Sequence, residues 1–290
     1  MSSLEKFVVF YHPSVTSTKA IASDIAAALQ SDHGVEALCT VTSDLDLDDM
    51  LAGADMLIAV GGDGTMLRVG RIGAAHACPV LGIDVGRLGY LFEVKPADKD
   101  VALQRVMQGD YWLEERMLVH GEHWRVDKCL ASHHALNEVA ITRGALARPV
   151  RLETKIDDCS LTTYVADGLI VSTPTGSTAY ALAAGGPILA PEMRNMVILP
   201  VAPHLSLDRA IVLAEGATIE IRIHTDHEAI LSADGQIEIA LQTGDHIRVH
   251  ASHLRAQFVR LQDRSYFYTN LTGHLIRNRH RANEQQVTVN

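Results

Sequence analysis

The stretch Asp55-Met56-Leu57-Ile58-Ala59-Val60-Gly61-Gly62-Asp63-Gly64-Thr65 decides how the first part of the chain folds. Five apolar residues are stopped by two glycines, and a helical pattern then runs over residues 65–75. A short apolar run bounded by glycine is typical of a buried strand, and the glycines allow a tight turn before a helix. The stretch therefore predicts a strand, a turn and a helix in succession.

The same alternation continues on both sides of this stretch. Strands are predicted at residues 7–11, 35–41 and 80–84. Helices are predicted at residues 16–30 and 98–108, and Gly34 is placed to end the first of them. Strands that are separated by helices predict an open, mostly parallel sheet with helices on both faces.

The second part of the chain has a different hydrophobic pattern, with short stretches in which apolar and polar residues alternate. These stretches are residues 112–125, 135–143, 150–156, 211–224 and 246–261. Such alternation is typical of antiparallel strands and predicts a β-rich, sandwich-like domain. We therefore expect an α/β domain at residues 1–110, a β-rich domain at 111–262 and a C-terminal tail at 263–290 that returns to the first domain or to a partner subunit.

Composition excludes several classes of protein. The 290 residues are 47% hydrophobic and 21% charged, which is typical of a globular protein with a substantial core. A net charge of -10 disfavours a broad surface for nucleic acid or anionic lipid, and no apolar run has the roughly 18–20 residues of a membrane span. Four scattered cysteines without a C-x-x-C pair, and no signal peptide, predict a cytoplasmic protein.

The glycine turn has two interpretations. Backbone N–H groups and the helix dipole at the start of a helix favour a phosphate, and glycines allow close approach of its oxygens. A carboxylate in such a turn, Asp63, indicates a hydroxyl or Mg²⁺ beside the phosphate. Alternatively, the glycines only make a tight turn, with Asp63 or Thr65 capping the helix.

A second strand, turn and helix follows later in the chain. The apolar residues 167–172 precede Thr173-Pro174-Thr175-Gly176-Ser177-Thr178 and a helical pattern at residues 179–184. Four hydroxyl side chains are more hydrogen-bonding groups than one helix cap requires, which favours a ligand site. A hydroxyl-rich cap without a ligand remains the alternative.

Together these blocks resemble the ATP-dependent NAD kinases. The matching blocks are Gly61 to Thr65, Leu136-Asn137-Glu138-Val139 and Asp167 to Tyr180, in the order and spacing of that family. Leu88-Gly89-Tyr90-Leu91 and Ser232-Ala233-Asp234-Gly235-Gln236 resemble two further segments of it. The resemblance spans nearly the whole chain.

The resemblance implies an activity and its requirements. It implies transfer of the γ-phosphate of ATP to the 2′-hydroxyl of the adenosine ribose of NAD, giving NADP, with Mg²⁺ or another divalent cation accompanying ATP. It also implies an α/β domain with a sandwich-like domain, a homodimer or homotetramer, and no nucleic-acid or membrane partner. Asp63 is the implied catalytic residue, which accepts a hydrogen bond and then a proton from that hydroxyl.

The resemblance also implies a set of binding residues. NAD would contact Asp63, Gly64, Tyr90, Asn137, Glu138, Asp167, Thr178, Ala179, Tyr180, Ala183 and Gln236. ATP phosphates would contact Gly61, Gly62, Thr65 and Arg68. In this family the contact matched by Asp167 can come across a subunit interface.

Some positions depart from the family pattern. Ala183 stands where the family often has serine, and Val165 stands where many bacterial members have an arginine associated with choosing NAD over NADH. Residues 203–210 match the usual H-[ST]-L-x-x-R-P segment only loosely. These departures leave the choice between NAD and NADH open.

Two other functions share part of the pattern. A lipid kinase of the diacylglycerol or sphingosine type resembles it in the glycine turn, although the long block up to Tyr180 favours an NAD kinase. A non-catalytic sensor of NAD(H) or NADP(H) would share the glycine turns but would not need the acceptor Asp63.

The histidines suggest no metal site from sequence alone. His246 and His250 can share one face of a strand near His253, but no cysteine or carboxylate completes a site. We therefore predict no zinc and no metal ion held by protein side chains.

Overall fold

The computed structural model describes residues 4–43, 47–86, 89–145, 148–204, 207–269 and 271. The chain divides into two compact units. Unit 1 comprises residues 1–114 and the chain from residue 257 onwards, and unit 2 comprises residues 115–256. The chain therefore passes from one unit to the other twice, within the long strands β5 (Trp112–Arg125) and β16 (His246–Arg260).

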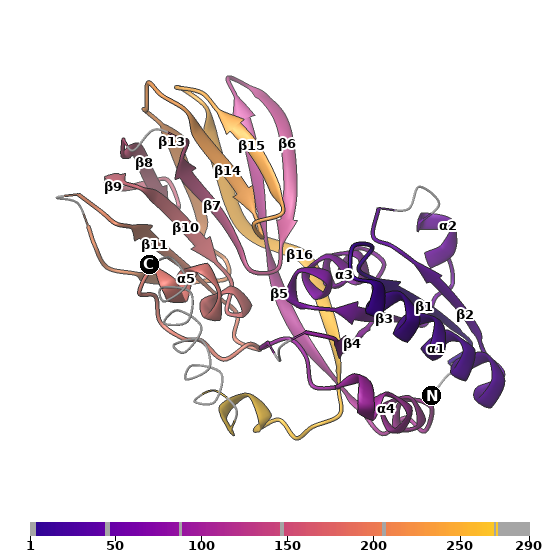
Figure 1. Ribbon diagram of the computed structural model, residues 1–290. Helices are drawn as coiled ribbons and strands as arrows, with labels where there is room; N and C mark the ends of the chain where they lie inside the picture. The colour runs from indigo at the N-terminus through magenta and orange to yellow at the C-terminus, as the bar shows by residue number, and fades with distance from the viewer. Residues whose placement is uncertain are drawn as a thin grey trace, which may run out of the picture. The chain divides into compact units, whose positions relative to one another are not determined.

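Unit 1 is built on a parallel sheet (Figure 1). Its strands lie in the order β2-β1-β3-β4, and the end of β16 adds a fifth strand through Phe258, which pairs in parallel with Val80. The strands are β1 (Lys6–Tyr11), β2 (Glu36–Thr40), β3 (Met56–Gly61) and β4 (Val80–Asp84). The helices are α1 (Thr16–His33), α2 (Leu47–Leu51), α3 (Asp63–Ala75), the 3-10 turn η1 (Pro96–Asp98) and α4 (Lys99–Met107).

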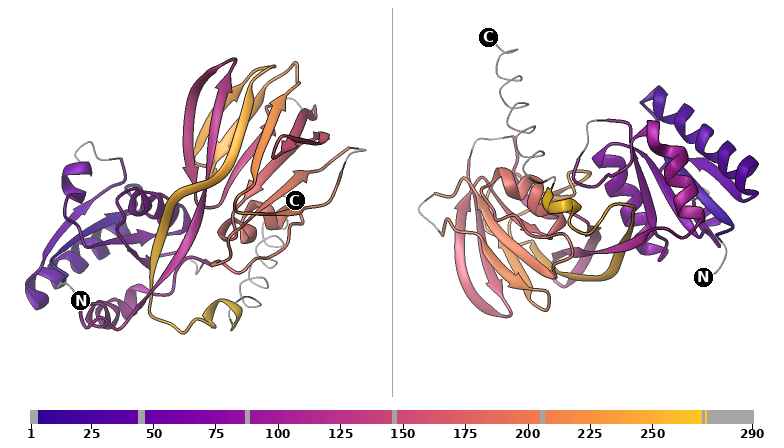
Figure 2. Two further views of the ribbon diagram at one scale, coloured as in Figure 1. Left: turned by 180° about the vertical axis from the view of Figure 1, so that it is seen from behind. Right: turned by 90° about the horizontal axis from the view of Figure 1, so that it is seen from below.

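Alternate residues of the central strand β3 face opposite layers of helices, because side chains along a strand alternate between faces. Ile58 belongs to the core cluster that includes Ile25 of α1 and Leu103 of α4, and these two helices lie side by side (Figure 2, right). The neighbouring residue Leu57 faces α3, since a Cβ on Gly73 would lie 3.6 Å from it. The predicted parallel sheet with helices on both faces is confirmed.

The end of α1 illustrates how sequence sets these boundaries. Gly34 adopts a left-handed conformation with φ of 69° and donates its N–H to the carbonyl of Gln30, and Val35 donates to Leu29. This pattern closes a helix and favours glycine, because a side chain is strained at positive φ. The predicted helix end at Gly34 is confirmed.

Unit 2 is a sandwich of two sheets around one apolar core. The first sheet has the order β12-β11-β10-β7-β14-β15 and is antiparallel. The second contains β16-β13-β8-β9, and β5 pairs with both β16 and β6. The remaining bounds are β6 (Lys128–Ala135), β7 (Glu138–Arg143), β8 (Val150–Ile156), β9 (Cys159–Ala166), β10 (Gly168–Ser172), β11 (Asn195–Val201), β12 (Ile211–Ala214), β13 (Thr218–Ile223), β14 (Ala229–Ala233) and β15 (Ile237–Leu241).

Residues 211–224, which the sequence predicts as one strand, form two strands in different sheets. β12 pairs with β11 in the first sheet, whereas β13 pairs with β16 and β8 in the second. Residues 215–217, with Gly216 at their centre, carry the chain from one sheet to the other. Apolar residues are frequent on both sides of this crossing, and the sequence pattern was therefore interpreted as one stretch.

The outer face of the first sheet packs against a short helical segment. Ile170 of β10 and Val197 of β11 contact Ala181 and Leu189 in a separate apolar cluster. Ala181 lies in α5 (Tyr180–Ala183), which follows the 3-10 turn η2 (Thr175–Thr178). This packing attaches the hydroxyl-rich turn to the sheet that precedes it.

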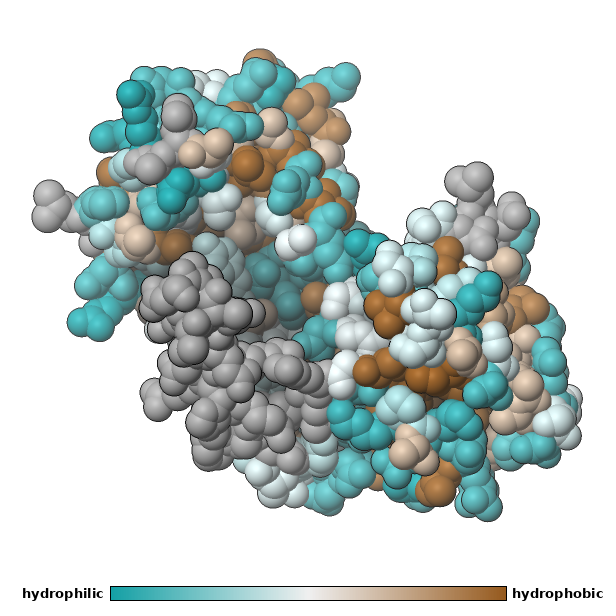
Figure 3. Space-filling model, in the orientation of Figure 1, coloured by the Kyte–Doolittle hydropathy of each residue, from teal (hydrophilic) through white to brown (hydrophobic). Residues whose placement is uncertain are grey.

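The visible surface is mainly hydrophilic, with apolar residues gathered over β6 and β15 (Figure 3). Val126 and Leu130 of the β5–β6 hairpin are among the exposed apolar side chains. Among the described residues, no helix combines the length and apolar character needed to cross a membrane. The four cysteines are free thiols. Most of the tail predicted at residues 263–290 lies outside the described residues.

Candidate functional site

The glycine turn of unit 1 presents Asp63 at the start of a helix. β3 ends at Gly61, and Gly62 has an extended conformation from which its carbonyl accepts the N–H groups of Thr65 at 2.9 Å and Met66 at 3.1 Å. Asp63 thus stands in the first turn of α3, where its side chain is exposed. The carboxylate lies at the helix end at which free N–H groups and the dipole attract anions.

Two glycines are required by close packing around this carboxylate. A Cβ on Gly61 would lie 2.7 Å from Cβ of Thr65, and a Cβ on Gly89 would lie 2.6 Å from Cγ of Asp63. Both distances are shorter than real contacts allow. The backbone at Gly89 therefore lies directly against the Asp63 carboxylate, and the half-buried Tyr90 follows it. Leu88, which also belongs to this predicted segment, is outside the described residues.

The residues predicted to contact phosphate differ in exposure. Gly62, Gly64 and Arg68 are exposed, and Arg68 lies one helical turn beyond Asp63. Gly61 and Thr65 are buried, and the Thr65 side chain packs against Gly61. The exposed members of the set are therefore the ones that a phosphate can reach.

A second carboxylate, which the sequence analysis did not single out, supports the same turn. Asp84 ends β4 and pairs in register with Gly61. It is 1% exposed, accepts the N–H of Gly86 at 3.0 Å and forms an ion pair with Lys95 at 2.9 Å. Asp84 therefore has its charge paired and fixes the backbone at Gly86, whereas Asp63 is the exposed carboxylate of the turn.

In unit 2 the predicted pair Asn137 and Glu138 is held by Asp234. The Asp234 carboxylate accepts the N–H groups of Leu136 at 3.0 Å, Asn137 at 2.7 Å and Glu138 at 3.3 Å. Asp234 has a φ of 53°, a left-handed conformation that aspartate adopts more readily than most residues. The sequence analysis placed Asp234 in a family segment but selected only Gln236 from it. A signal was available, because Asp-Gly is a typical turn pair.

The Glu138 side chain is buried without a complete set of partners. It is 7% exposed, and its Oε2 has no hydrogen-bond partner among the described residues. Burial, followed by the negative charge of Asp234, raises the pKa of Glu138 to about 8. A buried carboxyl oxygen without a partner is energetically unfavourable, so a ligand hydroxyl at this position would satisfy it.

The hydroxyl-rich turn uses most of its hydroxyl groups internally. Thr173 donates from Oγ1 to the carbonyl of Leu136 at 2.6 Å and accepts the N–H of Gly176 at 3.1 Å. Ser177 donates to Pro174 at 2.6 Å and accepts from Leu189 at 3.0 Å. The bond from Thr173 joins the turn to the segment just before Glu138, and the bonds of Ser177 hold it to neighbouring backbone, so these hydroxyls fix the shape of the turn.

Tyr180, which follows this turn, belongs to a polar region of unit 2 that also contains Asp167. Asp167 pairs with Arg143 at 3.2 Å. Burial, and then the charges of Asp167 and Glu138, raise the pKa of the Tyr180 hydroxyl. Tyr180 and Ala183 are exposed, whereas Thr178, Ala179 and Gln236 are half-buried. All five residues can therefore be reached by a ligand.

The predicted site residues thus form two groups, one in each unit. In unit 1 Asp63 lies against Gly89, which precedes Tyr90 in sequence, and in unit 2 the charges of Glu138 and Asp167 act on Tyr180. Val165 lies on β9 in unit 2, where its carbonyl accepts the N–H of His204 at 2.7 Å. Residues 205 and 206 of the loosely matching segment 203–210 are outside the described residues.

Comparison with known proteins identifies the family. The ATP-NAD kinase N-terminal domain matches residues 9–111, and the ATP-NAD kinase C-terminal domain matches residues 136–261. The NAD kinase of Chloroflexus aurantiacus is 40% identical over 275 residues, which cover 94% of this chain and 99% of that protein. The NAD kinase of Moorella thermoacetica is 42% identical over 221 residues, covering 76% and 71%.

Two solved structures share the fold. A yeast NADH kinase complexed with NADH has a TM-score of 0.82 at 25% identity, and the match covers 94% of this chain and 89% of that one. An NAD kinase from Archaeoglobus fulgidus in complex with ATP has a TM-score of 0.72 at 26% identity, covering 93% and 98%. The α/β domain with a β-rich second domain is confirmed, and the lipid kinase and sensor alternatives are not supported. The chain belongs to the NAD kinase family of phosphotransferases, which use an alcohol group as acceptor.

Proposed function

We propose that this chain transfers the γ-phosphate of ATP to the 2′-hydroxyl of the adenosine ribose of NAD, with Asp63 as the residue that receives the hydroxyl proton. The observation that carries the proposal is the position of Asp63: an exposed carboxylate, fixed against Gly89, in the first turn of a helix between exposed glycines. Anion-binding groups and a proton acceptor are therefore adjacent.

The chemistry follows from this arrangement. The ribose O2′ attacks the γ-phosphorus in line, the bond from that phosphorus to the ADP oxygen breaks, and the O2′ proton passes to the Asp63 carboxylate. Because phosphoryl transfer is largely loose, orienting the hydroxyl contributes more than strong basicity. Gly62, Gly64 and Arg68 would contact the phosphates.

A divalent cation fits this site as part of the bound ATP. Mg²⁺ typically keeps water and phosphate oxygens and takes one or two carboxylates, and Asp63 offers one exposed carboxylate. When bound, the ion would neutralise charge that develops on the phosphate oxygens. The nearby Asp84 is already paired with Lys95, so we assign it no part in holding the ion.

The residues of unit 2 would bind NAD. Glu138 supplies a buried oxygen that lacks a partner, which suits a ribose hydroxyl, and Asn137 supplies an amide beside it. Tyr180, with Thr178, Ala179 and Ala183, offers an accessible surface for the adenosine within unit 2. Tyr90 of unit 1 is a further proposed contact of NAD. Asp167 and Gln236 complete the proposed set. The binding of NADH by the yeast relative and of ATP by the Archaeoglobus relative supports both ligand classes.

We further propose a homodimer or homotetramer in the cytoplasm. The subunit contact of Asp167 that the family resemblance implies supports the oligomer, and the cysteine pattern supports the compartment. Both remain predictions for size measurements and for localisation of the tagged protein in cells.

An ADP-release assay tests the proposed activity. Purified protein is given ATP and Mg²⁺ with NAD, with NADH, with a diacylglycerol or with no acceptor. We expect rapid ADP release with a dinucleotide, together with NADP or NADPH as the phosphorylated product. Equal release without an acceptor, or release only with the lipid, would refute the proposal.

A further inference from the structure

A cluster of histidines lies in unit 2 on three neighbouring strands. His120 of β5 stacks on His134 of β6 with 4.4 Å between ring centroids, and His120 also meets His250 of β16 edge-on at 5.1 Å. All three side chains are half-buried. None of them belongs to the groups assigned above to NAD or ATP.

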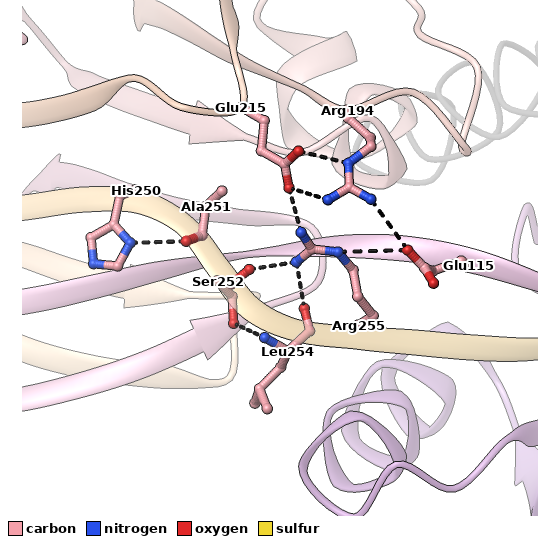
Figure 4. Close-up of polar contacts among 8 residues, drawn as sticks. All are labelled: Glu115, Arg194, Glu215, His250, Ala251, Ser252, Leu254 and Arg255. Carbon is pink, nitrogen blue, oxygen red and sulfur yellow. Dashed lines mark hydrogen bonds and ion pairs between the residues drawn. The ribbon is translucent and has the colours of Figure 1, made fainter.

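The hydrogen bonds fix which ring nitrogen of His250 faces His120. His250 bonds through Nδ1 to the carbonyl of Ala251 at 2.9 Å (Figure 4), so Nδ1 carries the proton and Nε2 presents a lone pair. Metal-binding histidines commonly donate their other ring N–H to a backbone carbonyl in this way. His250 therefore has the tautomer that a metal ligand requires.

The spacing of the facing nitrogens also suits an ion. Nδ1 of His120 lies 3.4 Å from Nε2 of His250, which is long for a nitrogen-to-nitrogen hydrogen bond. Two nitrogens held at about 2.0–2.1 Å from one tetrahedral zinc are separated by about 3.3–3.4 Å.

Glu122 supplies a third ligand. Its carboxylate and the two imidazoles place one ligand atom each within 4.8 Å of one another. The Glu122 Oε2 accepts the indole N–H of Trp124 at 3.0 Å, which orients the carboxylate. The sequence alone predicts no zinc site, because no cysteine or carboxylate completes a site with the histidines of residues 246–253. That reason was wrong, because Glu122 comes from β5, which pairs with β16.

We propose that His120, Glu122 and His250 bind a divalent transition-metal ion, with Zn²⁺ as the ion best suited to two imidazoles and one carboxylate. This set leaves a fourth position for water. The ion would join β5 to β16, the two strands in which the chain passes between its units. The site is separate from the proposed Mg²⁺–ATP chemistry and does not depend on it.

A surface cavity gives the ion access to the site, and Glu122 provides a negative charge there. A surface cavity of about 670 Å³ is lined by both Glu122 and His250. Two other acids of this cavity are neutralised, because Glu215 pairs with Arg194 and Arg255 (Figure 4) and Glu220 pairs with Arg248. Among the described residues, Glu122 forms no ion pair with a lysine or arginine, so a cation would balance its charge.

His134 provides a matched control within the same cluster. Its Nδ1 lies 2.9 Å from Oγ of Ser252, and that oxygen already accepts the N–H of Leu254 at 2.9 Å. Whichever of the two atoms donates, Nδ1 of His134 is engaged in a hydrogen bond with Ser252 and does not face the site. His134 packs on the site without contributing a ligand.

Calorimetric titration of the untagged full chain with Zn²⁺, without nucleotides, tests the proposal. We expect one equivalent to bind the unmodified protein. His120→Gln, Glu122→Gln and His250→Gln should each lose that equivalent or bind it more than about tenfold more weakly, whereas His134→Gln should retain it. The melting temperature, measured in parallel, should rise on adding Zn²⁺ only in the proteins that bind the ion, since a ligand that binds the native state stabilises that state.

Kinase activity and the melting temperature without zinc establish that each variant is folded. The absence of a stoichiometric Zn²⁺ equivalent in the unmodified protein would reduce the His120–His250 contact to a hydrogen bond only and overturn the proposal. Unchanged Zn²⁺ binding by folded His120→Gln and His250→Gln would also overturn it. Loss of the equivalent in His134→Gln with retention in His120→Gln would reject the assigned ligand set.

Discussion

The turn at residues 61–65 and the turn at residues 173–178 both follow a buried strand and precede a helical segment, yet they use their polar groups differently. The first leaves the Asp63 carboxylate exposed at the start of a 13-residue helix. The second is buried over residues 173–177, and Thr173 and Ser177 bond to neighbouring backbone. A polar side chain in a turn is therefore a stronger candidate for chemistry when the fold leaves it exposed.

The comparison predicts that substitutions in the first turn affect turnover and that those in the second affect stability. The largest effect is expected for Asp63→Asn, which keeps the shape of the side chain and removes the proton acceptor. We expect turnover to fall by about 10²–10⁴-fold while NAD binding stays within about tenfold. Steady-state kinetics and calorimetric NAD binding measure both quantities. Unchanged turnover would remove the proposed role of Asp63.

Gly89→Ala sharpens the same point without changing the carboxylate itself. The added methyl group would meet Asp63, whose Cγ would lie 2.6 Å away, and would displace it. A displacement of about 1 Å can reduce turnover about 10²-fold. Gly216→Ala is the control, because a Cβ there has open space. Equal kinetics for the two folded variants would argue that the Gly89 contact does not position Asp63.

Glu138→Gln tests the buried carboxyl group of unit 2 through pH. The pKa of Glu138 is raised from 4.5 to about 8, so the folded state keeps a proton that the unfolded state releases in this range. Its contribution to stability is therefore full below pH 4.5 and is lost as pH rises towards 8, by on the order of a few kcal/mol. In Glu138→Gln, which has no titrating group at this position, the free energy of unfolding should not show this loss. Urea unfolding of both proteins across this window measures the difference, and parallel profiles would contradict the assigned pKa.

Thr173→Val is expected to have the smallest effect and to act on stability. It leaves the carbonyl of Leu136 and the N–H of Gly176 without their hydroxyl partner, which costs about 1–3 kcal/mol. Turnover of the folded variant should stay within severalfold of normal. Thr163→Val, on an exposed strand position, is the control for urea unfolding. A loss of turnover as large as that of Asp63→Asn would show that the second turn also takes part in chemistry.

Much of this fold could be predicted from sequence because many of its strands are short apolar blocks, and glycines mark where strands and helices end. The boundaries at Gly34 and Gly61 follow from the conformations or contacts that only glycine tolerates. The division of residues 211–224 between two sheets could not be predicted, because apolar alternation is the same whichever sheet a strand joins.

The residues of the candidate site could be predicted from sequence, but their burial, pKa values and partners could not. The motifs selected Asp63 and Glu138, but the pKa of Glu138 is raised first by burial and then by the charge of Asp234, which lies almost a hundred residues away in sequence. The proximity of Glu122 to His250 arises in the same way from strand pairing. Local patterns reveal which chemical groups are present, whereas long-range pairing determines their charge and partners.

The central claim is that the Asp63 carboxylate contacts the ribose 2′-hydroxyl, and a binding cycle tests it most directly. Affinities of NAD and of its analogue lacking the 2′-hydroxyl of the adenosine ribose are measured for the unmodified protein and for Asp63→Asn. We predict that removing the hydroxyl weakens binding about tenfold in the unmodified protein, as expected for a hydrogen bond to a charged group, and has little effect in the variant. The same ratio of affinities in both proteins would contradict the account.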